Sequence, residues 1–516
     1  MARKLGILVA DFGGQYAHLI ARRCRELGVY SEIIEPELVE RELRRRKDVG
    51  GVILSGGPMS VFDPKSPTID PMPILEKAVP ILGICYGHQL IAKLFGGELK
   101  RGKYREYGRT SIEVVNHDLL LDGLPEKFSV WMSHGETVIE PPPKFRITSR
   151  SEGNVITSMS DENRKIYSTQ FHPEVVHTEH GKKILENFLR KICGIEAWWS
   201  PGDRVKKLIE EIRSKVREDE KVICAVSGGI DSVTTATLVS KAVGDRLYCI
   251  FVDHGLMRKG EREQVEETLR KLGIKNLMVI DAWKRFLEKL RGVSDPEEKR
   301  RIIGEEFIRV FEEAASKIPG IRWLAQGTIY PDRIESGRAG RKAALIKSHH
   351  NVGALPERMH LKLLEPLRDF YKDEVREIAR RLGIPDEIVK RHPFPGPGLA
   401  VRIIGEVTEE KLEICREANA ILEEELKRSG IYDKVWQGFA VACSDKWVGV
   451  MGDSRVEGYI IIVRIVESVD GMTADWYKID QELLEKISNR ITREIPKVTM
   501  VAYAATSKPP STIEPC

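Results

Sequence analysis

Short apolar runs alternate with charged, amphipathic segments through the first two thirds of the chain. In the first third, residues 5–10, 51–55, 79–84 and 166–171 form such runs. Beyond residue 202 the alternation resumes, with strand-like runs at 221–226, 246–252, 276–280 and from 324. Strands that alternate with helical patterns predict parallel sheets covered by helices. We therefore predict two parallel-sheet α/β domains.

The pattern changes after residues 392–399, where His-Pro-Phe-Pro-Gly-Pro-Gly-Leu is too rich in proline and glycine for a regular element and is typical of a rigid hinge. A helical pattern then covers residues 409–429, and strand-like runs follow at 439–443, 447–452 and 459–466. This predicts a small α+β unit. The predicted domains are 1–195, 196–394 and 395–516. A core as small as that of the third domain favours burial against a second copy of the chain.

Composition narrows the class of protein. The 516 residues include 82 basic and 78 acidic side chains, so the net charge is only +4 and gives no case for a nucleic-acid partner. The N-terminus lacks the pattern of a signal peptide, and no apolar run approaches the roughly 20 residues of a membrane span. We expect a cytoplasmic protein without a membrane partner. The eight cysteines show no CxxC spacing, so most of them are expected to be reduced and buried.

Residues 225–232, Ala-Val-Ser-Gly-Gly-Ile-Asp-Ser, follow a strand-like run and precede a helical one. Adjacent glycines allow close backbone approach, and a helix start presents unpaired N–H groups and a positive dipole end, which suit an oligophosphate. Two serines can donate hydroxyls, and Asp231 can hold a divalent cation. No Gly-Lys-Ser/Thr follows, so this is not a Walker loop. On these residues alone, a tight turn without a ligand is as good an interpretation.

The octapeptide resembles the pyrophosphate loop of enzymes that adenylate a substrate and release pyrophosphate. The resemblance implies ATP as co-substrate and Mg²⁺ held by Asp231 and Asp253. The strand-like run 246–252 ends at Asp253, and the run that begins at residue 324 leads into Gln326 and Gly327, on the same predicted sheet edge. The implied ATP site comprises Ser227, Gly228, Gly229, Ile230, Asp231, Ser232, Val233, Asp253, Gln326 and Gly327.

Cys85 lies at the end of a strand-like run, with Gly83 and Gly87 two residues to either side. A structural cysteine would be the default, but this spacing is typical of a nucleophile elbow, in which a strained strand-to-helix turn presents the side chain. The dipole of the following helix favours a thiolate. A thiol nucleophile needs a base and an orienting group, and His172 and Glu174 follow another strand-like run.

These motifs resemble the triad-type (class I) glutamine amidotransferases over about residues 5–190. The resemblance implies that Cys85 attacks glutamine, that His172 shuttles protons and that Glu174 orients the imidazole. It further implies an oxyanion hole at Gly57 and Tyr86 and a glutamine contact at Gln89. Ser-His-Gly-Glu at residues 133–136 matches another family motif whose last residue is normally Asp, so the role of Glu136 is left open.

Residues 346–353, Ile-Lys-Ser-His-His-Asn-Val-Gly, suit a cationic lid over phosphates, with Lys347, His349 and His350 as candidates. A zinc site is the alternative, but no second cluster of Cys or His lies at ligand spacing. The motifs at residues 227–232, 252–258, 325–332, 346–353 and 391–399, in this order along the chain, resemble those of the glutamine-hydrolysing GMP synthetase family. That resemblance implies XMP, ATP and glutamine as substrates, a homodimer formed by the C-terminal domain, and XMP contacts from Gln437, Lys508 and Glu514.

The C-terminal residues 507–516 match the family's terminal signature up to Glu514, but Pro515 and Cys516 depart from it. Pro509 and Pro510 favour an extended polyproline conformation, whereas without the resemblance the tail is typical of a disordered end. Two other functions are open. A tRNA-modifying adenylating enzyme would need sulfur-carrying cysteines and a basic face, and a catalytically inactive sensor would not need Cys85, His172, Glu174 and Asp231.

Overall fold

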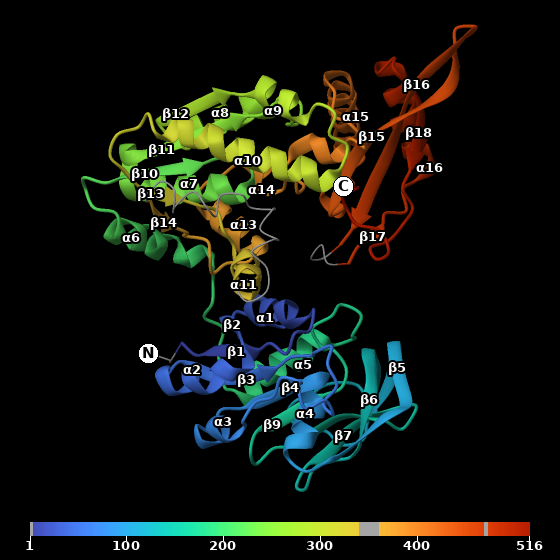
Figure 1. The fold of residues 1–516 in the computed structure, drawn as a ribbon. Helices are drawn as coiled ribbons and strands as arrows, with labels where there is room; N and C mark the ends of the chain where they lie inside the picture. The colour runs from blue at the N-terminus through green and yellow to red at the C-terminus, as the bar shows by residue number, and fades with distance from the viewer. Residues whose placement is uncertain (1–3, 340–360, 469–472, 516) are drawn as a thin grey trace. The chain divides into compact units, whose positions relative to one another are not determined.

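The chain folds into two units, residues 1–200 and 201–516 (Figure 1). The structure is a computed structural model and describes residues 4–339, 361–468 and 473–515. The predicted boundary between residues 394 and 395 lies inside the second unit and stays a prediction.

The first unit is built on a nine-stranded sheet with the order β2-β1-β3-β4-β9-β8-β7-β5-β6. Its parallel half consists of β1 (Gly6–Ala10), β2 (Ser31–Ile34), β3 (Val49–Leu54), β4 (Ile81–Ile84) and β9 (Ile166–Thr169). Every residue of β1, β4 and β9 is buried, as expected for a sheet covered on both faces. The predicted parallel sheet is therefore confirmed for this half.

The other half of this sheet is antiparallel and was not predicted. It consists of β5 (Glu98–Val114), β6 (Lys127–Glu140), β7 (Arg146–Ser151) and β8 (Ile156–Asp161). Buried and more exposed residues alternate along much of β6, so few long apolar runs mark these strands in the sequence. The helices of the first unit are α1 (Ala17–Glu26), α2 (Val39–Arg45), α3 (Met72–Glu76), α4 (Tyr86–Leu94) and α5 (Gly181–Asn187).

The second unit begins with a five-stranded parallel sheet of order β12-β11-β10-β13-β14, which confirms the second predicted parallel sheet. The strands are β10 (Lys221–Ala225), β11 (Leu247–Asp253), β12 (Asn276–Asp281), β13 (Ile321–Ala325) and β14 (Lys362–Leu364). Strand β10 pairs with both β11 and β13, so the loops that follow these three strands meet at one edge of the sheet. That edge carries the predicted ATP site.

Helices cover both faces of this second sheet. Ile223 and Ile250 face a core shared with helices α9 and α10, while α7 packs against α6 and α13. The helices are α6 (Val205–Lys215), α7 (Ile230–Val243), α8 (Glu261–Lys271), α9 (Trp283–Leu290), α10 (Pro296–Ala315), α11 (Tyr330–Ala339), α13 (Lys372–Arg381) and α14 (Asp386–Val389).

The end of the chain forms the predicted α+β arrangement. Its strands are β15 (Gln437–Met451), β16 (Ser454–Glu467), β17 (Asp475–Trp476) and β18 (Val498–Tyr503), and its helices are α15 (Glu409–Arg428) and α16 (Gln481–Glu494). The two strands predicted at 439–443 and 447–452 are one strand, β15, whose pairing register shifts between Ala442 and Lys446. Strands β15 and β16 form the long hairpin drawn in orange and red in Figure 1.

A single hydrophobic core joins the parallel sheet to this C-terminal layer. It contains Ile223 and Ile250 from the sheet together with Leu422 of α15 and Ile461 of β16. The connecting residues 392–397 adopt no helix or strand, as predicted, and a short 3₁₀ helix covers Gly398–Arg402. Gly398 has φ of +65°, and a Cβ there would lie 2.2 Å from the Leu256 carbonyl oxygen, so the hinge requires glycine at this point.

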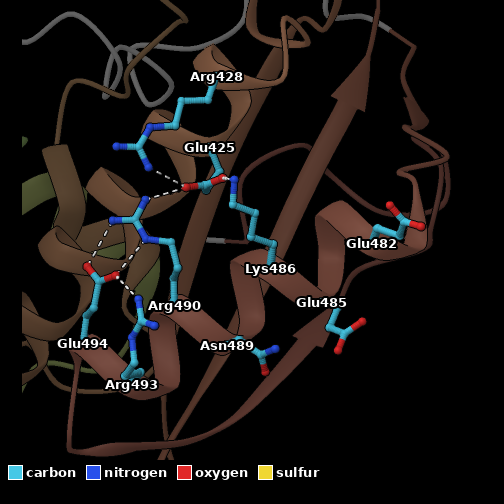
Figure 2. A pocket seen from close by; sticks show the side chains of 9 residues that line it. All are labelled: Glu425, Arg428, Glu482, Glu485, Lys486, Asn489, Arg490, Arg493 and Glu494. Carbon is cyan, nitrogen blue, oxygen red and sulfur yellow. Dashed lines mark hydrogen bonds and ion pairs between the residues drawn. The ribbon is translucent and has the colours of Figure 1, made fainter.

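An ion-pair cluster fastens helix α16 to helix α15. The side chain of Glu425 on α15 is completely buried and lies 3.1 Å from Arg428, 2.8 Å from Lys486 and 2.6 Å from Arg490. Figure 2 shows the three cationic groups converging on this carboxylate at the edge of a pocket of about 560 Å³. A buried carboxylate is tolerated here because several charge-assisted hydrogen bonds replace its hydration.

Candidate active site

Cys85 occupies the sharp turn between β4 and α4. Its φ of 54° and ψ of −103° are unusual for a residue with a side chain, and its N–H donates to the Thr169 carbonyl at 2.8 Å. A Cβ on Gly83 would lie 2.5 Å from the Gly87 carbonyl oxygen, and one on Gly87 would lie 2.4 Å from the Leu54 carbonyl oxygen. Both glycines are therefore needed for the turn, which presents the thiol at the start of a helix.

His172 and Glu174 lie beside this thiol. The imidazole Nδ1 and the Glu174 carboxylate are 2.7 Å apart, and both side chains are buried. A Cβ on Gly56 would lie 3.2 Å from His172 Cε1 and 3.6 Å from Cys85 Cβ, so His172 and Cys85 both lie next to Gly56. The ring of Tyr16 packs edge-on against the imidazole at 5.0 Å. The fold thus brings together the three predicted catalytic side chains.

Two effects act in opposite directions on the charge of His172. Burial lowers the pKa of His172 because it disfavours the charged imidazolium. The negative charges of Glu174 and Cys85, and the hydrogen bonds to both, outweigh burial and raise the pKa of His172 to about 10. A cationic imidazole next to the sulfur stabilises a thiolate, which is the reactive form of cysteine. The arrangement is suited to nucleophilic attack followed by proton transfer to a leaving amine.

Gly57 and Tyr86, the predicted oxyanion donors, lie next to each other. A Cβ on Gly57 would be 3.4 Å from Tyr86 Cγ, and Tyr86 is the first residue of α4, where backbone N–H groups have no partner within the helix. Gln89, the predicted glutamine contact, is buried, and its Nε2 donates to the Glu136 carbonyl at 2.9 Å and to Gln170 Oε1 at 3.2 Å. Its amide nitrogen is therefore already engaged within the protein.

The predicted phosphate loop connects β10 to α7. Gly228 has φ of +80°, and a Cβ there would lie 2.4 Å from Val265 Cγ2. Gly229 precedes the helix, while Ser227 and Ser232 contact each other through their hydroxyls at 3.3 Å. Ile230 and Val233 are buried and anchor the first turn of α7. The result is a polar loop at a helix N-terminus, the usual geometry for binding phosphate.

Asp231 lies in this first turn and makes an ion pair with Lys372, the first residue of α13. Its other oxygen, Oδ1, is buried and has no hydrogen-bond partner within the described part of the chain. The loop after β13 packs directly against it, because a Cβ on Gly327 would lie 3.0 Å from the Asp231 carbonyl carbon. Gln326 donates its N–H to the Leu364 carbonyl at 3.0 Å. The predicted residues of β10 and β13 are thus adjacent.

Asp253 ends β11, next to β10, but its carboxylate is occupied. Oδ1 accepts a hydrogen bond from the Gly255 N–H at 3.0 Å, and Oδ2 pairs with Arg262 at 3.2 Å. Among the residues that the structure describes, no three His, Cys, Asp or Glu side chains are grouped in a way that could hold a metal ion by themselves. The predicted lid residues Lys347, His349 and His350, and with them the zinc alternative, lie outside the described residues.

Two of the three predicted XMP contacts meet in the C-terminal layer. Gln437 Nε2 donates to Glu514 Oε1 at 2.6 Å and to the Pro393 carbonyl at 3.1 Å. Arg402, which the sequence analysis did not single out, contacts the same Glu514 carboxylate through two nitrogens. Its guanidinium lies 5.0 Å from the ring of Phe394 and 4.5 Å from that of Phe439. The only sign of this residue in the sequence is that an arginine follows the hinge motif at residues 392–399 closely.

Lys508 forms an isolated β-bridge with Ala474. Pro509 and Pro510 follow in a turn, so the extended polyproline conformation predicted for them is wrong. The tail is nevertheless ordered, since Arg464 donates to the carbonyls of Thr506, Thr512 and Ile513 at 2.8–3.0 Å. Tertiary contacts, rather than local stiffness, place Glu514.

Lys372 is the second functional candidate that sequence reasoning missed. It follows Tyr371, whose ring packs 5.1 Å from that of buried Tyr330, and Tyr371 caps α13 together with Glu374. These contacts fix the helix start from which Lys372 reaches Asp231. A single lysine far from the phosphate loop in sequence carries no recognisable pattern, so only the tertiary structure could identify it.

Comparisons with known proteins cover nearly the whole chain. Residues 8–192 match the family described as glutamine amidotransferase class-I, and residues 424–515 match the GMP synthase C terminal domain. The chain is 57% identical to a GMP synthase (glutamine-hydrolyzing) of Pyrobaculum aerophilum over 99% of both chains. Relatives with the same description from Carboxydothermus hydrogenoformans and Aquifex aeolicus are 54% and 52% identical, over 98% of this chain and 99% of theirs.

Proposed function

The chain belongs to the glutamine-hydrolysing GMP synthase family, and we propose that its two units divide the reaction between a glutaminase site and an adenylation site. The reaction consumes ATP, XMP, glutamine and water, and it yields AMP, diphosphate, GMP and glutamate. The protein is thus a carbon–nitrogen ligase of guanine nucleotide synthesis with glutamine as nitrogen donor. The observation that supports the division is the Cys85–His172–Glu174 triad in one unit and the phosphate loop in the other.

In the glutaminase site, the Cys85 sulfur attacks the side-chain amide carbon of glutamine. The oxygen that becomes negative lies toward the backbone N–H groups of Gly57 and Tyr86, which stabilise it. The His172 imidazolium then gives a proton to the departing ammonia, and the resulting neutral imidazole takes a proton from the water that cleaves the thioester to release glutamate. Glu174, at 2.7 Å, keeps the imidazole ring in the orientation that these transfers require.

In the second unit, the xanthine O2 of XMP attacks the α-phosphorus of ATP, and diphosphate leaves. Ammonia then displaces AMP from the purine, because adenylation has converted a poor oxygen leaving group into a good one. The start of α7 and the hydroxyls of Ser227 and Ser232 would receive the phosphate oxygens. Lys372 would supply positive charge close to the same phosphates.

The residues at the sheet edge that carries the phosphate loop meet part of what a Mg²⁺ site requires. The buried oxygen Asp231 Oδ1 has no hydrogen-bond partner in the described regions, so it is suited to a cation. Asp253 on the neighbouring strand would have to release Arg262 to contribute a second oxygen. Mg²⁺ commonly binds through one or two carboxylates together with phosphates and water. When bound, the ion would neutralise charge on the departing diphosphate.

XMP would be held in the C-terminal layer by Gln437, Lys508 and Glu514, with Arg402 orienting Glu514. We propose that this layer also forms a homodimer. Large apolar side chains near the C-terminal end of β15 support this, because Trp447 is 51% and Val450 77% exposed. We propose that the reaction takes place in the cytoplasm. Among the described residues, no helix combines the length and apolar character that a bilayer span requires.

The decisive experiment measures AMP, GMP and glutamate with each substrate omitted in turn. AMP should form only when ATP and XMP are both present, and GMP should form with either glutamine or ammonium. AMP formation that does not depend on XMP would overturn the proposed function. Failure of glutamine, but not ammonium, to support GMP formation would overturn only the glutaminase assignment.

A further inference from the structure

Glu136 occupies the position where the related amidotransferase motif normally has aspartate, and the proposed reaction gives it no role. It lies in β6, and its side chain is only 14% exposed. Its carboxylate reaches across to the loop between β3 and α3, residues 55–71. One oxygen accepts a hydrogen bond from the Ser60 hydroxyl, and the other accepts the Val61 N–H at 3.2 Å. This contact fastens the loop to the sheet.

Arg101 strengthens this contact from the neighbouring strand. It is the direct pairing partner of Glu136 in β5, and its Nε lies 3.3 Å from Glu136 Oε1. Its Nη2 donates to the Ser60 hydroxyl at 2.8 Å, and its guanidinium lies 5.0 Å from the ring of Phe62. Three polar groups from two strands and one loop therefore close a small hydrogen-bonded ring. The charge of Glu136 is central to it, because the carboxylate accepts two of the three hydrogen bonds of the ring, one from Ser60 and one from Arg101.

The backbone of the same strand segment contacts Cys85 and the predicted glutamine contact Gln89. The Glu136 carbonyl accepts hydrogen bonds from Gln89 Nε2 at 2.9 Å and from His134 Nδ1 at 3.1 Å. Three residues earlier, the Ser133 carbonyl lies 3.6 Å from the Cys85 sulfur. A shift of Glu136 would thus move the surroundings of the nucleophile and of the predicted glutamine contact together.

The loop that Glu136 holds begins with the oxyanion segment at Gly57. Helix α4 holds it as well, through the Tyr86 hydroxyl, which donates to the Pro67 carbonyl at 2.7 Å, and through Lys93, which donates to the Val61 carbonyl. Val61 is therefore held at its N–H by β6 and at its carbonyl by α4. The loop is fixed on both sides, next to the turn that carries Cys85.

We propose that Glu136 is a positioning residue of the glutamine site, which holds the 55–71 loop and the 133–136 segment in the geometry that binds the glutamine side chain. The proposal rests on the glutaminase function of the first unit. The carboxylate does not touch the reacting atoms, so its removal should weaken glutamine binding more than it slows the chemical step. Ammonium-dependent GMP formation, which bypasses this site, should not change.

The test compares Glu136→Gln with wild type in glutamine-dependent and ammonium-dependent GMP formation. The change keeps the size of the side chain but removes its charge and one acceptor. We expect the KM for glutamine to rise about tenfold, the scale of one charge-assisted hydrogen bond, with kcat within about twofold. Glu113→Gln, an exposed carboxylate of the same sheet paired only with exposed Lys127 in the described structure, is the matched control and should leave both values unchanged. An unchanged KM in Glu136→Gln would overturn the proposal.

Two further variants separate contact with the loop from a general electrostatic effect on Cys85. Glu136→Asp keeps the charge but shortens the side chain by one methylene, so it should also raise the KM for glutamine. Wild-type behaviour of Glu136→Asp beside an impaired Glu136→Gln would show that charge alone acts, and it would overturn the positioning role. Ser60→Ala removes the partner hydroxyl, and a double-mutant cycle with Glu136→Gln should show non-additive effects on KM. Additive effects would contradict the proposed contact.

Cys85→Ala distinguishes this proposal from the function on which it rests. If Cys85→Ala loses glutamine-dependent activity while Glu136→Gln keeps a normal KM, only the role of Glu136 is wrong. If Cys85→Ala retains glutamine hydrolysis, the glutaminase assignment itself fails. Alkylation of the Cys85 thiol by iodoacetamide should proceed at the wild-type rate in Glu136→Gln, which would show that the elbow is still folded and reactive. A large loss of alkylation would indicate a misfolded turn and overturn the proposed split between KM and kcat.

Discussion

Arg402 and Glu514 form a two-point ion pair, with Nε 3.1 Å from Oε2 and Nη2 2.9 Å from Oε1. Arg402 is 2% exposed, and the carboxylate that balances its buried charge belongs to Glu514, close to the C-terminus. The contact joins the segment after the hinge to the C-terminal tail. Changes in the tail are therefore expected to affect stability as well as any nucleotide contact.

Two tail variants should separate these effects. Glu514→Gln leaves a buried guanidinium without its counter-charge, so it should lower the free energy of unfolding by about 3–5 kcal/mol. Lys508→Ala leaves that ion pair intact and should raise the KM for XMP about tenfold or more through loss of a charge-assisted phosphate contact. Denaturant unfolding and XMP kinetics measure the two quantities. Normal XMP kinetics in Lys508→Ala would exclude Lys508 from the nucleotide site.

Replacing Cys85 with alanine should abolish glutamine-dependent GMP formation and spare the ammonium-dependent reaction. The nucleophile proposed for glutamine is then missing, whereas the phosphate loop lies in the other unit. Steady-state rates with each nitrogen source check this prediction. Loss of both activities in a folded Cys85→Ala protein would contradict separate sites.

The charge of His172 should depend on Glu174. Replacing Glu174 with Gln removes the attraction that opposes the cost of burial, so the pKa of His172 should fall from about 10 and glutamine hydrolysis should drop by about 10²–10⁴-fold. An NMR titration of the imidazole and glutaminase assays test both statements. An unchanged titration would show that Glu174 does not control this charge.

The same ionisation predicts how stability depends on pH. The folded pKa of His172, about 10, lies above its ordinary value of 6.5. Its protonation therefore stabilises the fold fully below pH 6.5, and this stabilisation is lost as the pH rises through 10. Denaturant unfolding between pH 6 and 10 should show this decline in wild type and a smaller one in Glu174→Gln. Equal slopes in the two proteins would contradict the assignment.

Asp231 and Lys372 should both be needed for adenylation. Asp231→Asn keeps the shape but removes the charge proposed to hold Mg²⁺, so XMP-dependent AMP formation should fall by about tenfold to a thousandfold. Lys372→Met should act in the same direction because it removes positive charge next to the phosphates. Basal glutamine hydrolysis should persist in both variants. Unaffected AMP formation in a folded Asp231→Asn protein would mean that the loop is only a structural turn.

Glu425 should make the C-terminal layer sensitive to acid. Burial raises the pKa of this carboxyl, but hydrogen bonds from Lys486, Arg490 and Arg428 prevail and lower it from 4.5 to about 2. Its contribution to stability is present above pH 4.5 and is lost as the pH falls through 2.

Glu425→Gln should therefore lower the free energy of unfolding at pH 7 by about 2 kcal/mol, the scale of a lost charged hydrogen bond, and this difference from wild type should shrink below pH 4.5. Glu485→Gln, an exposed change on α16, is the control. Denaturant unfolding at pH 7 and pH 3 tests this. A difference that does not change with pH would exclude ionisation of Glu425 as the cause.

The sequence by itself determined the parts of the protein whose signals are local. The strand-to-helix turns at Cys85 and Ser227 were predictable because glycines, an apolar run before and a helical pattern after lie within a dozen residues. The parallel direction of the strands in the two predicted sheets followed from their alternation with helices. His172 and Glu174 follow one strand-like run at a spacing of two, and together with the Cys85 turn they carry the family resemblance that implies their roles.

Only the tertiary structure decided the contacts between distant segments. Three pairs of residues that touch in the structure are far apart in the sequence, and none of them belongs to a periodic or local pattern. These pairs are Lys372 with Asp231, Arg402 with Glu514, and Glu136 with Ser60. The antiparallel strands β5–β8 escaped prediction for a related reason, since pairing across a sheet, rather than a continuous apolar run, specifies them. Local physics therefore specifies the turns that present the reactive groups, whereas long-range packing decides which charges surround them.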